Sequence, residues 1–598
     1  MIRIAELKLP LAAVPYHPEN HTEFPPTEKL TQLASERLGI PAQAIASLHV
    51  HKRSFDARKS ALLAVYIVDV TLADEALHAQ LLAKFADDSH VNPTPDMAWK
   101  PAGQAPADLA ERPVVVGFGP CGIFAALVLA QMGFKPIVLE RGKQVRERTK
   151  DTWGLWRKRE LTPESNVQFG EGGAGTFSDG KLYSQIKDPR HLGRKVMTEF
   201  VEHGAPPEIL YAAHPHIGTF KLVKVVEGIR EEIIRLGGEI RFEQRVTDVV
   251  IDAAPHGEDV QRQLTALQVL NQATGESYTL PARHAVMALG HSSRDTFAMF
   301  YERGVAMEAK PFSVGFRIEH PQSVIDRARW GKDAGHPLLG AADYKLVHHA
   351  KNGRAVYSFC MCPGGTVVAA TSEPERVVTN GMSQYSRAER NANAGMVCAI
   401  TPEDYPQDAE SFAWAFGGKT YGVEKLPKGE HHPLSGIVLQ RQLESRAYAL
   451  GGRNYSAPGQ LVGDFVAGNP STEFGAVQPS YKPGISLGDL HQALPAYAIE
   501  AMREALPAFG KKIRGYDMAD AVLTGVETRT SSPVKIGRGA DFQSDNTRGL
   551  YPAGEGASYA GGILSAGVDG IKVGEAVACD ILGLPVPSSG ARGSGGAL

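Results

Sequence analysis

The stretch VVVGFGPCGIFAALVLAQMGFKPIVLER, residues 114–141, determines the fold that we expect for this chain. Three valines at 114–116 predict a buried strand, which runs into Gly117, Gly119 and Gly122 before a helix rich in small residues. A second apolar strand over 136–139 ends in Glu140, 18 residues after Gly122. Strand, glycine turn, helix and acid-tipped strand in this order predict a Rossmann-type dinucleotide site rather than an ordinary βαβ turn.

Each part of this segment has a physical reason. The first glycine permits a tight turn, the second lets the backbone approach a pyrophosphate, and the third lets the helix touch the strand. The helix N-terminus offers unpaired N–H groups to phosphates, and Glu140 can accept hydrogen bonds from the ribose hydroxyls of an adenosine. The cofactor-binding residues predicted here are Gly117, Gly119, Pro120, Gly122, Glu140 and Arg141.

Residues 549–578, GLYPAGEGASYAGGILSAGVDGIKVGEAVA, favour FAD over NAD. An apolar run leads to Gly554 and Glu555, whose carboxylate could hydrogen-bond the ribityl chain of a flavin. Gly561 and Gly562 then open a helix at Ile563, and its positive end would stabilise negative charge on the reduced flavin. A simple nicotinamide dehydrogenase has no need of this element. The alternative is a C-terminal packing helix with small residues.

Two further segments are expected beside the cofactor. QFGEGGAGTFSDGKLYS (168–184) lacks a preceding strand and a following acid, so Gly172, Gly173 and Gly175 are assigned to a loop along the cofactor. The alternative is a flexible surface loop. In RHAVMALGHSSRDTF (283–297) a strand ends at Gly290, and Val246, in the preceding β-meander, would offer backbone groups to the adenine.

The chain as a whole is expected to be of the α/β class. We predict a small N-terminal α/β (ferredoxin-like) domain over 1–105, followed by a linker rich in Pro and Ala. A Rossmann-type FAD-binding domain would span 110–305 and resume over 520–585. A β-rich α+β substrate domain would be inserted at 306–519, and residues 586–598 would form a tail.

Composition excludes several classes of protein. With 43% hydrophobic and 22% charged residues, and 63 Lys+Arg against 66 Asp+Glu, the chain is globular and not a wholesale polyanion binder. Five cysteines cannot form a disulfide framework, and two close cysteines are too few for a zinc site, so no metal is expected. The longest apolar run, 123–130, is too short for a membrane span, and no secretory leader is recognised at the start, so a cytoplasmic location is expected.

Several motifs carry a resemblance to a known family. FGEGGAGTFSDGKL, HPHIGT, ALGHSSRDTF, FCMCPGG, GVETRTSSPVKIGR and YPAGEGASYAGGILSAGVDG resemble the bacterial family of uncharacterised FAD-dependent dehydrogenases. That family is similar to the NAD(P)/FAD-dependent oxidoreductases of the glutathione-reductase-like superfamily, on the branch with fumarate reductases and aromatic hydroxylases. The resemblance implies a FAD-dependent oxidoreductase without naming a substrate. No His adjoins Gly172–Gly173, so noncovalent FAD is expected.

Two cationic residues are candidates for the chemistry. Lys181, just beyond the glycine loop, could face the flavin N5 or an anionic substrate, and the alternative is a solvated loop lysine. Arg529, in ETRTSSP, could hold a carboxylate or contact the flavin edge, and the alternative is a structural salt bridge.

The motif HPHIGT supplies a candidate acid or base. His216 precedes a predicted helix over 220–236, with its buried stripe at Val223, Val226, Ile229 and Ile233. A histidine near a helix start can move protons, although capping and packing are the alternatives.

Cys360 and Cys362 are the remaining candidates. In a regular strand both thiols would point the same way, with Cα atoms about 6.6 Å apart, near the upper limit for a disulfide. Pro363 and the glycines after it could curl the chain and bring the thiols closer, as a flavin-linked dithiol requires. Buried, inert cysteines are the alternative.

The electron source and the partners are open at this stage. No second strand–GxGxxG–helix–acid unit occurs between 190 and 520, so NAD(P)H would bind only transiently, in the cavity of the small-molecule substrate. A substrate or a redox carrier protein could deliver the electrons instead.

A different hypothesis is a flavin-dependent RNA-modifying or RNA-binding protein using the basic segment 49–59. Residues 1–100 hold 10 Lys+Arg against 12 Asp+Glu, so nucleic acid is disfavoured. The oligomeric state is not predicted.

Overall fold

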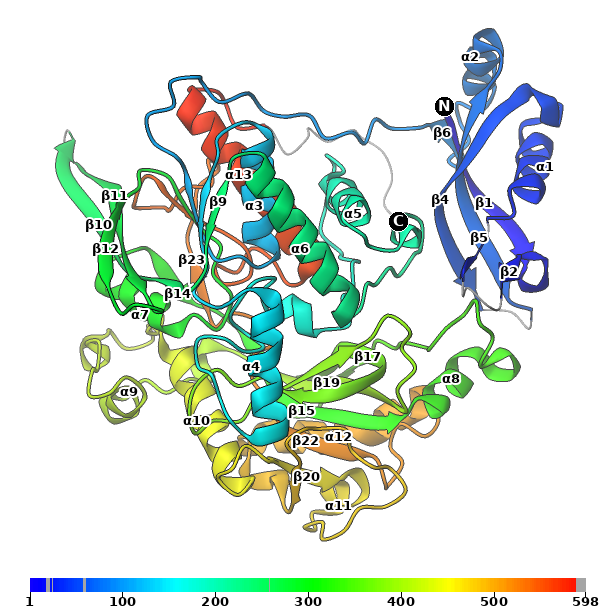
Figure 1. Ribbon diagram of the computed structural model, residues 1–598. Helices are drawn as coiled ribbons and strands as arrows, with labels where there is room; N and C mark the ends of the chain where they lie inside the picture. The colour runs from blue at the N-terminus through cyan, green and yellow to red at the C-terminus, as the bar shows by residue number, and fades with distance from the viewer. Residues whose placement is uncertain (18–21, 24, 58–60, 257–258, 588–598) are drawn as a thin grey trace.

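The computed structural model describes residues 1–17, 22–23, 25–57, 61–256 and 259–587. Three parts are visible in Figure 1. A parallel sheet with its helices lies at the centre, a large, mainly antiparallel sheet with helices lies below it, and the N-terminal part lies to one side. We call these parts the parallel-sheet domain, the large-sheet domain and the N-terminal domain.

The parallel-sheet domain is built on five short strands in the order β24-β13-β7-β8-β9, and all four neighbouring pairs are parallel. Parallel strands require crossover connections, which helices provide here. The strands are β7 (Val114–Val116), β8 (Ile137–Leu139), β9 (Glu239–Arg241), β13 (Ala285–Met287) and β24 (Leu550–Pro552). The helices are α3 (Pro120–Gln131), α4 (Val145–Lys158), α5 (Leu192–Glu202), α6 (Thr219–Arg235), α7 (Arg294–Glu302) and α13 (Ile563–Leu582).

Glycines allow this domain to close around α3. A Cβ atom on Gly122 would lie 1.9 Å from the carbonyl oxygen of Gly117, so only glycine lets the helix turn onto the strand. Gly117 itself has a φ of +96°, in the region that favours glycine. Helix α13 packs against α3 in the same manner, because a Cβ on Gly570 would lie 2.2 Å from the Cys121 carbonyl oxygen. The glycine fingerprint is therefore a packing device as well as a turn.

The expected β-meander is present as an antiparallel sheet beside the parallel one. Its strands are β10 (Gln244–His256), β11 (Asp259–Asn271) and β12 (Ser277–Pro281), in that spatial order. A separate two-stranded sheet pairs β14 (Met307–Ala309) with β23 (Val534–Ile536).

Helix α6 forms where it was predicted, but its buried face differs by one residue from the predicted stripe. Val223 is only half-buried, whereas Leu222 and Val225 are buried, together with Val226, Ile229 and Ile233. The apolar face of this helix is wide, so its centre could not be fixed from spacing alone. The prediction for Val223 was wrong.

The large-sheet domain contains eight strands, with the main order β16-β17-β19-β15-β22-β20-β21 and β18 paired to β17. The strands are β15 (Phe312–Pro321), β16 (Val347–His349), β17 (Ala355–Ala369), β18 (Thr379–Ser383), β19 (Asn391–Ile400), β20 (Ala457–Leu461), β21 (Ile485–Leu487) and β22 (Val522–Glu527). The helices are α8 (Gln322–Trp330), α9 (Ala409–Ala415), α10 (Ser435–Leu450), α11 (Val462–Ala467) and α12 (Ala496–Lys512). Among the described helices of all three domains, none is long and apolar enough to cross a membrane.

The large sheet extends beyond residue 519, where we had predicted the inserted domain to end. Strand β22 pairs with β15 and with β20, so residues 522–527 belong to the large sheet. The chain returns to the parallel sheet only at β24. An apolar strand in the sequence does not reveal which sheet it joins, and that is why this boundary was placed too early.

Buried charges join the two large domains. Arg294, at the start of α7, donates two hydrogen bonds to the carboxylate of Glu444 in α10. Arg529, after β22, donates two more to the same carboxylate, at 3.1 Å each. The three side chains are at most 3% exposed. Burial alone would raise the pKa of Glu444, but the two guanidinium charges lower it, so the carboxylate stays ionised.

The N-terminal domain has the strand order β4-β5-β1-β6, with neighbouring strands antiparallel and two helices in a βαββαβ chain order. Its main elements are β1 (Ile2–Pro10), α1 (Thr27–Leu38), β4 (Ile45–Asp56), β5 (Leu63–Leu72), α2 (Glu75–Lys84) and β6 (Val91–Pro93), with a short hairpin of β2 (Tyr16–His17) and β3 (Thr22–Glu23). This strand order is that of ferredoxin-like domains.

The basic segment 49–59 contacts the parallel-sheet domain through the backbone of Arg53. Within β4, the Arg53 N–H donates to the Tyr211 carbonyl at 2.6 Å, and the Ala213 N–H donates to the Arg53 carbonyl at 2.9 Å. The strand edge is thus paired with the parallel-sheet domain, and nothing supports the RNA-contact hypothesis. Arg58 and Lys59 lie outside the described residues.

The expected linker after β6 is also held in place. It crosses one side of the parallel-sheet domain (Figure 1), where the Trp99 indole donates to the carboxylate of Glu575 in α13 at 2.9 Å. Farther along, the Ala105 N–H donates to the Met132 carbonyl at 2.8 Å. The connection is therefore a docked segment.

The close packing of α3 against α13 can be tested by adding one methyl group at Gly570. Gly570→Ala should destabilise the protein by about 1–3 kcal/mol, because the new Cβ would overlap the Cys121 carbonyl and one helix must shift. The measurement is the thermal unfolding midpoint. Gly488→Ala is the matched control, since a Cβ at Gly488 meets no atom within 4 Å. Equal midpoints for the two variants would contradict this packing.

Candidate functional site

A cavity of about 950 Å³ lies between the parallel-sheet domain and the large-sheet domain. We call it the central cavity. The segments that follow β7, β8 and β13 contribute to its wall, as do the glycine loop, the start of α13 and the middle of β17. In open α/β sheets, ligands bind at the carboxyl ends of the strands, and this cavity is in that place.

One end of the central cavity is a cradle of bare backbone. A Cβ on Gly119 would meet only Gly173, at 3.4 Å, and a Cβ on Gly290, Gly561 or Gly562 would meet nothing within 4 Å. All five glycines line the cavity. Backbone without side chains next to open space is what close approach to a pyrophosphate or a flavin ring requires.

Glu140 lies at the cradle and is nearly buried, with 4% of its surface exposed. Its carboxylate accepts hydrogen bonds from the N–H groups of Phe118 and Gly142, both at 2.8 Å. A carboxylate has about four acceptor positions, so two remain for the hydroxyls of a ribose. The residue therefore shapes the glycine turn and can still bind the adenosine half of a cofactor.

Arg141 lines the same region but is held by the protein itself. Its guanidinium donates to Glu164 at 2.8 Å and to Asp295 at 2.9 Å, and it lies 4.2 Å from the centre of the Phe169 ring. These contacts fix the wall of the cavity beside Glu140.

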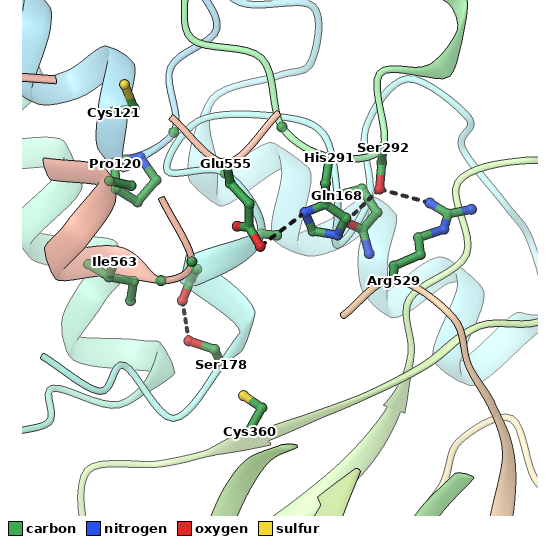
Figure 2. A pocket seen from close by; sticks show the side chains of 18 of the residues that line it. Pro120, Cys121, Gln168, Ser178, His291, Ser292, Cys360, Arg529, Glu555 and Ile563 are labelled. Carbon is green, nitrogen blue, oxygen red and sulfur yellow. Dashed lines mark hydrogen bonds and ion pairs between the residues drawn. The ribbon is translucent and has the colours of Figure 1, made fainter. Parts of the chain in front are cut away.

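The start of α13, which lies near the C-terminus of the chain, also faces the cavity. Gly561, Gly562 and Ile563 line it, and the first N–H groups of a helix carry a partial positive charge. Close by, His291 Nδ1 lies 3.7 Å from Glu555 Oε1, and Figure 2 shows this pair on the cavity wall. The partial positive charge at the start of α13 and the carboxylate of Glu555 are thus both available to the polar edges of a bound aromatic ring system.

Most of the predicted cofactor residues meet at this cavity. Those that line it are Gly117, Gly119, Pro120, Glu140, Arg141, Gly173, Gly175, Val246, Gly290, Glu555, Gly561, Gly562 and Ile563. Gly122, Gly172 and Gly554 do not line it but allow close packing behind it. A Cβ on Gly172 would lie 2.1 Å from Thr176 Oγ1, and one on Gly554 would lie 2.9 Å from the Cβ of Cys121.

Lys181 lines the cavity and reaches across it. Its ammonium group donates to the Met361 carbonyl in β17, which links the glycine loop to the large sheet. An ammonium has three donors, so two stay available to a ligand.

His216 does not line the cavity, in contrast to its predicted role as an acid or base. Its Nε2 lies 2.9 Å from the Tyr385 carbonyl oxygen, and its ring stacks on the Tyr385 ring at 5.3 Å. Burial, assisted by the charge on Arg387, lowers the pKa of His216 to about 3. The residue is a packing histidine, which was the alternative interpretation.

Arg529 lines the cavity, but its donors are largely taken by the protein. Besides Glu444, it donates to the hydroxyls of Ser292 (3.0 Å) and Ser372 (2.7 Å). Ser292 in turn donates to Gln168 at 3.0 Å, and Figure 2 shows this chain along the wall. The structural salt bridge, one of the two interpretations from the sequence, is therefore present.

Cys360 lines the cavity and Cys362 lies behind it, and both are free thiols. The pairing of β17 with β19 shifts register between Phe359 and Cys362, and Cys360 has a φ of +43°, so a bulge replaces the regular strand that we expected. A hydrogen bond from Cys362 lowers the pKa of Cys360 against the effect of burial, and nearby Arg317 adds to this. The pKa of Cys362 is raised. Figure 2 shows Cys360, which, like Ser178, lines the cavity.

The cavity also contains a group of residues that we had not predicted from the sequence. Tyr183 lies opposite His214 across the backbone ladder that pairs Lys181 with His216, and the Tyr183 and His214 rings stack at 4.7 Å. His214 Nδ1 lies 3.4 Å from the carboxylate of Asp343, which comes from the large-sheet domain. The motif HPHIGT contains both histidines, and the one that we had named, His216, does not line the cavity, whereas His214 does. No signal pointed to Asp343.

Comparisons with known proteins can now be set beside this geometry. A protein of Clostridium beijerinckii, named only as an uncharacterized protein, is 46% identical over 543 residues, which cover 90% of this chain and 94% of the relative. The chain belongs to the same family as this clostridial protein. Residues 311–530 also match a family model described as "FAD-dependent protein, C-terminal domain-like", and residues 1–71 match a domain of unknown function, DUF8436.

Solved structures give only weak likenesses. A glycerol-3-phosphate dehydrogenase of Bacillus halodurans complexed with FAD aligns with 12% identity over 81% of this chain and 67% of its own, with a TM-score of 0.32. A flavoprotein/dehydrogenase of Cytophaga hutchinsonii aligns with 12% identity over 80% of each chain, with a TM-score of 0.29. Alignments at these scores do not establish a shared fold.

Removing the carboxylate of Glu140 should weaken FAD binding. In Glu140→Ala the ribose loses a charged acceptor and the glycine turn loses two tethers, so we expect at least about a tenfold rise in the Kd for FAD. Titration of the flavin-free protein with FAD measures this change. Glu147→Ala, an exposed acid in α4 outside the cavity, is the control. Unchanged, stoichiometric flavin in the Glu140 variant would contradict the assignment.

Cys360 should be the most reactive thiol of this protein. Because its pKa is lowered and it reaches the cavity, iodoacetamide at pH 7 should label it before the four buried cysteines, as read by peptide mass mapping. Cys360→Ser should remove the fast labelling, and Cys398→Ser should leave it unchanged. Fast labelling at another cysteine, or none at Cys360, would refute the assignment.

Proposed function

We propose that this protein is a FAD-dependent oxidoreductase of the dehydrogenase or reductase type, which holds FAD noncovalently and transfers hydride to or from a small molecule. The match of residues 311–530 to a model of FAD-dependent proteins supports FAD as the cofactor. The motifs that resemble the glutathione-reductase-like flavoproteins support the same class.

The observation that carries this proposal is the cradle. Bare glycine backbone from three distant segments, 117–119, 173–175 and 561–562, surrounds one open space together with Glu140. A Cβ on Gly290, Gly561 or Gly562 would meet nothing within 4 Å, whereas a Cβ on the packing glycines Gly122 and Gly570 would overlap a backbone carbonyl oxygen. Bound FAD would supply the capacity to accept or donate a hydride.

The residues of this chain have distinct tasks in this proposal. Glu140 accepts from the ribose, the N–H groups at the start of α3 face the pyrophosphate, and the start of α13 stabilises negative charge on the flavin. The large-sheet domain closes the other side of the cavity, where Lys181 and Cys360 face the substrate. Closure by a second domain excludes water, which protects a hydride transfer from side reactions.

The source of electrons follows from what the fold offers. Within the described part of the chain, one parallel sheet carries a glycine turn of the dinucleotide type. NAD(P)H, if used, therefore binds in the central cavity and leaves after hydride transfer. The substrate itself or a redox carrier protein are the other donors that this arrangement admits.

An anaerobic visible spectrum tests the proposal. The purified protein should show the bands of oxidised flavin, and acid precipitation should release the FAD into the supernatant. Bleaching on addition of NADPH or NADH would identify a reductase fed by a nicotinamide. Bands that persist would identify a dehydrogenase fed by its own substrate or by a carrier. Absence of flavin after reconstitution with FAD would overturn the proposal.

A further inference from the structure

Charges in the central cavity are not evenly distributed. Two cations behind the wall have an acid of the wall as their partner: Arg317 is 2.8 Å from Glu527, and Arg387 is 2.9 Å from Asp179. The cradle carries the acids Glu140 and Glu555. Ligand groups that meet these two carboxylates are expected to be hydrogen-bond donors, such as hydroxyls.

Another part of the cavity has the opposite character. We call it the cationic compartment, and its residues are Lys181, Tyr183, His214, Arg329, Asp343 and Lys345. It opens to solvent, since Tyr183 is 45% exposed and the His214 side chain is 60% exposed. Arg329 comes from α8, and Lys345 from the segment before β16.

The compartment has three lysine or arginine cations, Lys181, Arg329 and Lys345. Among the residues that the structure describes, none forms an ion pair with Lys181, Arg329 or Lys345. The nearby acid, Asp343, is engaged by His214. Burial alone would raise the pKa of Asp343, but the hydrogen bond with His214 and the charge on Lys181 lower it to about 2. The compartment thus keeps an excess of positive charge at neutral pH.

Lys181 is half-buried in the cavity wall, whereas Arg329 and Lys345 are exposed. Protein around Lys181 reduces the screening by water, so an anion is attracted more strongly there than on an open surface. Lys181 is also positioned by its bond to the Met361 carbonyl, which lowers the entropy cost of binding a ligand. The stacked rings of Tyr183 and His214 form a flat wall beside it.

We propose that the cationic compartment binds the oxyanion group of the molecule that exchanges hydride with the flavin, through Lys181, Arg329 and Lys345. This inference rests on the proposed function and names its substrate class: a molecule with a carboxylate or a phosphate at one end and the reacting bond at the other. The cofactor occupies the acidic end of the cavity, and the anion holds the substrate at the cationic end.

The experiment uses the FAD-loaded protein, so that the cradle is filled and free anions cannot bind there. Succinate and inorganic phosphate are the probes, at constant ionic strength set by sodium chloride, and succinamide is the neutral control. The readouts are the visible difference spectrum of the flavin and the thermal unfolding midpoint. We expect a saturable response to at least one probe and none to succinamide.

The variant Lys181→Gln/Arg329→Gln/Lys345→Gln should lose this response, with a Kd at least about tenfold higher. Its control, Lys332→Gln/Lys351→Gln/Lys428→Gln, removes three exposed charges outside the cavity and should respond like the wild type. If the triple variant does not fold, Arg329→Gln/Lys345→Gln carries the test, because both side chains are exposed.

The probes separate the two sources of an oxyanion. A response to succinate alone indicates an organic acid, and a response to phosphate alone indicates a phosphorylated compound or the phosphates of a nicotinamide nucleotide. Either result supports the compartment as an oxyanion site. No saturable response in FAD-loaded protein, or an equal response in the triple variant, would overturn it. Protein that cannot hold FAD would instead refute the proposed function.

Discussion

The walls of the cavity depend on one buried carboxylate, that of Glu444, which is bound by the guanidinium groups of Arg294 and Arg529. Glu444 lies in α10, whereas Arg294 belongs to α7 and Arg529 follows β22. A buried charge without its partner is costly by several kcal/mol, so loss of any one of these three groups would destabilise the contact between the domains. Because Arg529 also binds Ser292 and Ser372, the same cluster fixes the wall between the domains.

The sequence predicted the parts of the fold that are specified locally. The strand over 114–116, the glycine turn and helix α3 form where they were expected, because contacts within one βαβ unit decide them. The steric need for glycine at 122 is likewise set by a residue five positions earlier, Gly117. Such short-range requirements leave a readable pattern of residue types. The predicted cofactor residues from Gly117 to Arg141 follow from that pattern, because they all lie within this one unit.

What the sequence did not predict depends on contacts between distant segments. His214 lines the cavity and His216 does not. Tyr385 contacts the His216 ring, and Asp343 lies beside the His214 ring. Nothing near the histidines encodes either neighbour. Strand β22 joined the large sheet for a similar reason, since its partners β15 and β20 are remote in the chain. The bulge at Cys360 is also a property of pairing with β19.

The N-terminal domain has a place in this arrangement that its position in the chain does not suggest. Its edge strand β4 exchanges two backbone hydrogen bonds with residues 211–213, immediately before His214. A small cleft beside this domain is lined by Phe55 of β4 and also by Arg329, which belongs to the cationic compartment as well. The domain therefore supports the backbone that presents His214 and borders the side chain of Arg329. The glycine cradle, by contrast, contains no residue of this domain.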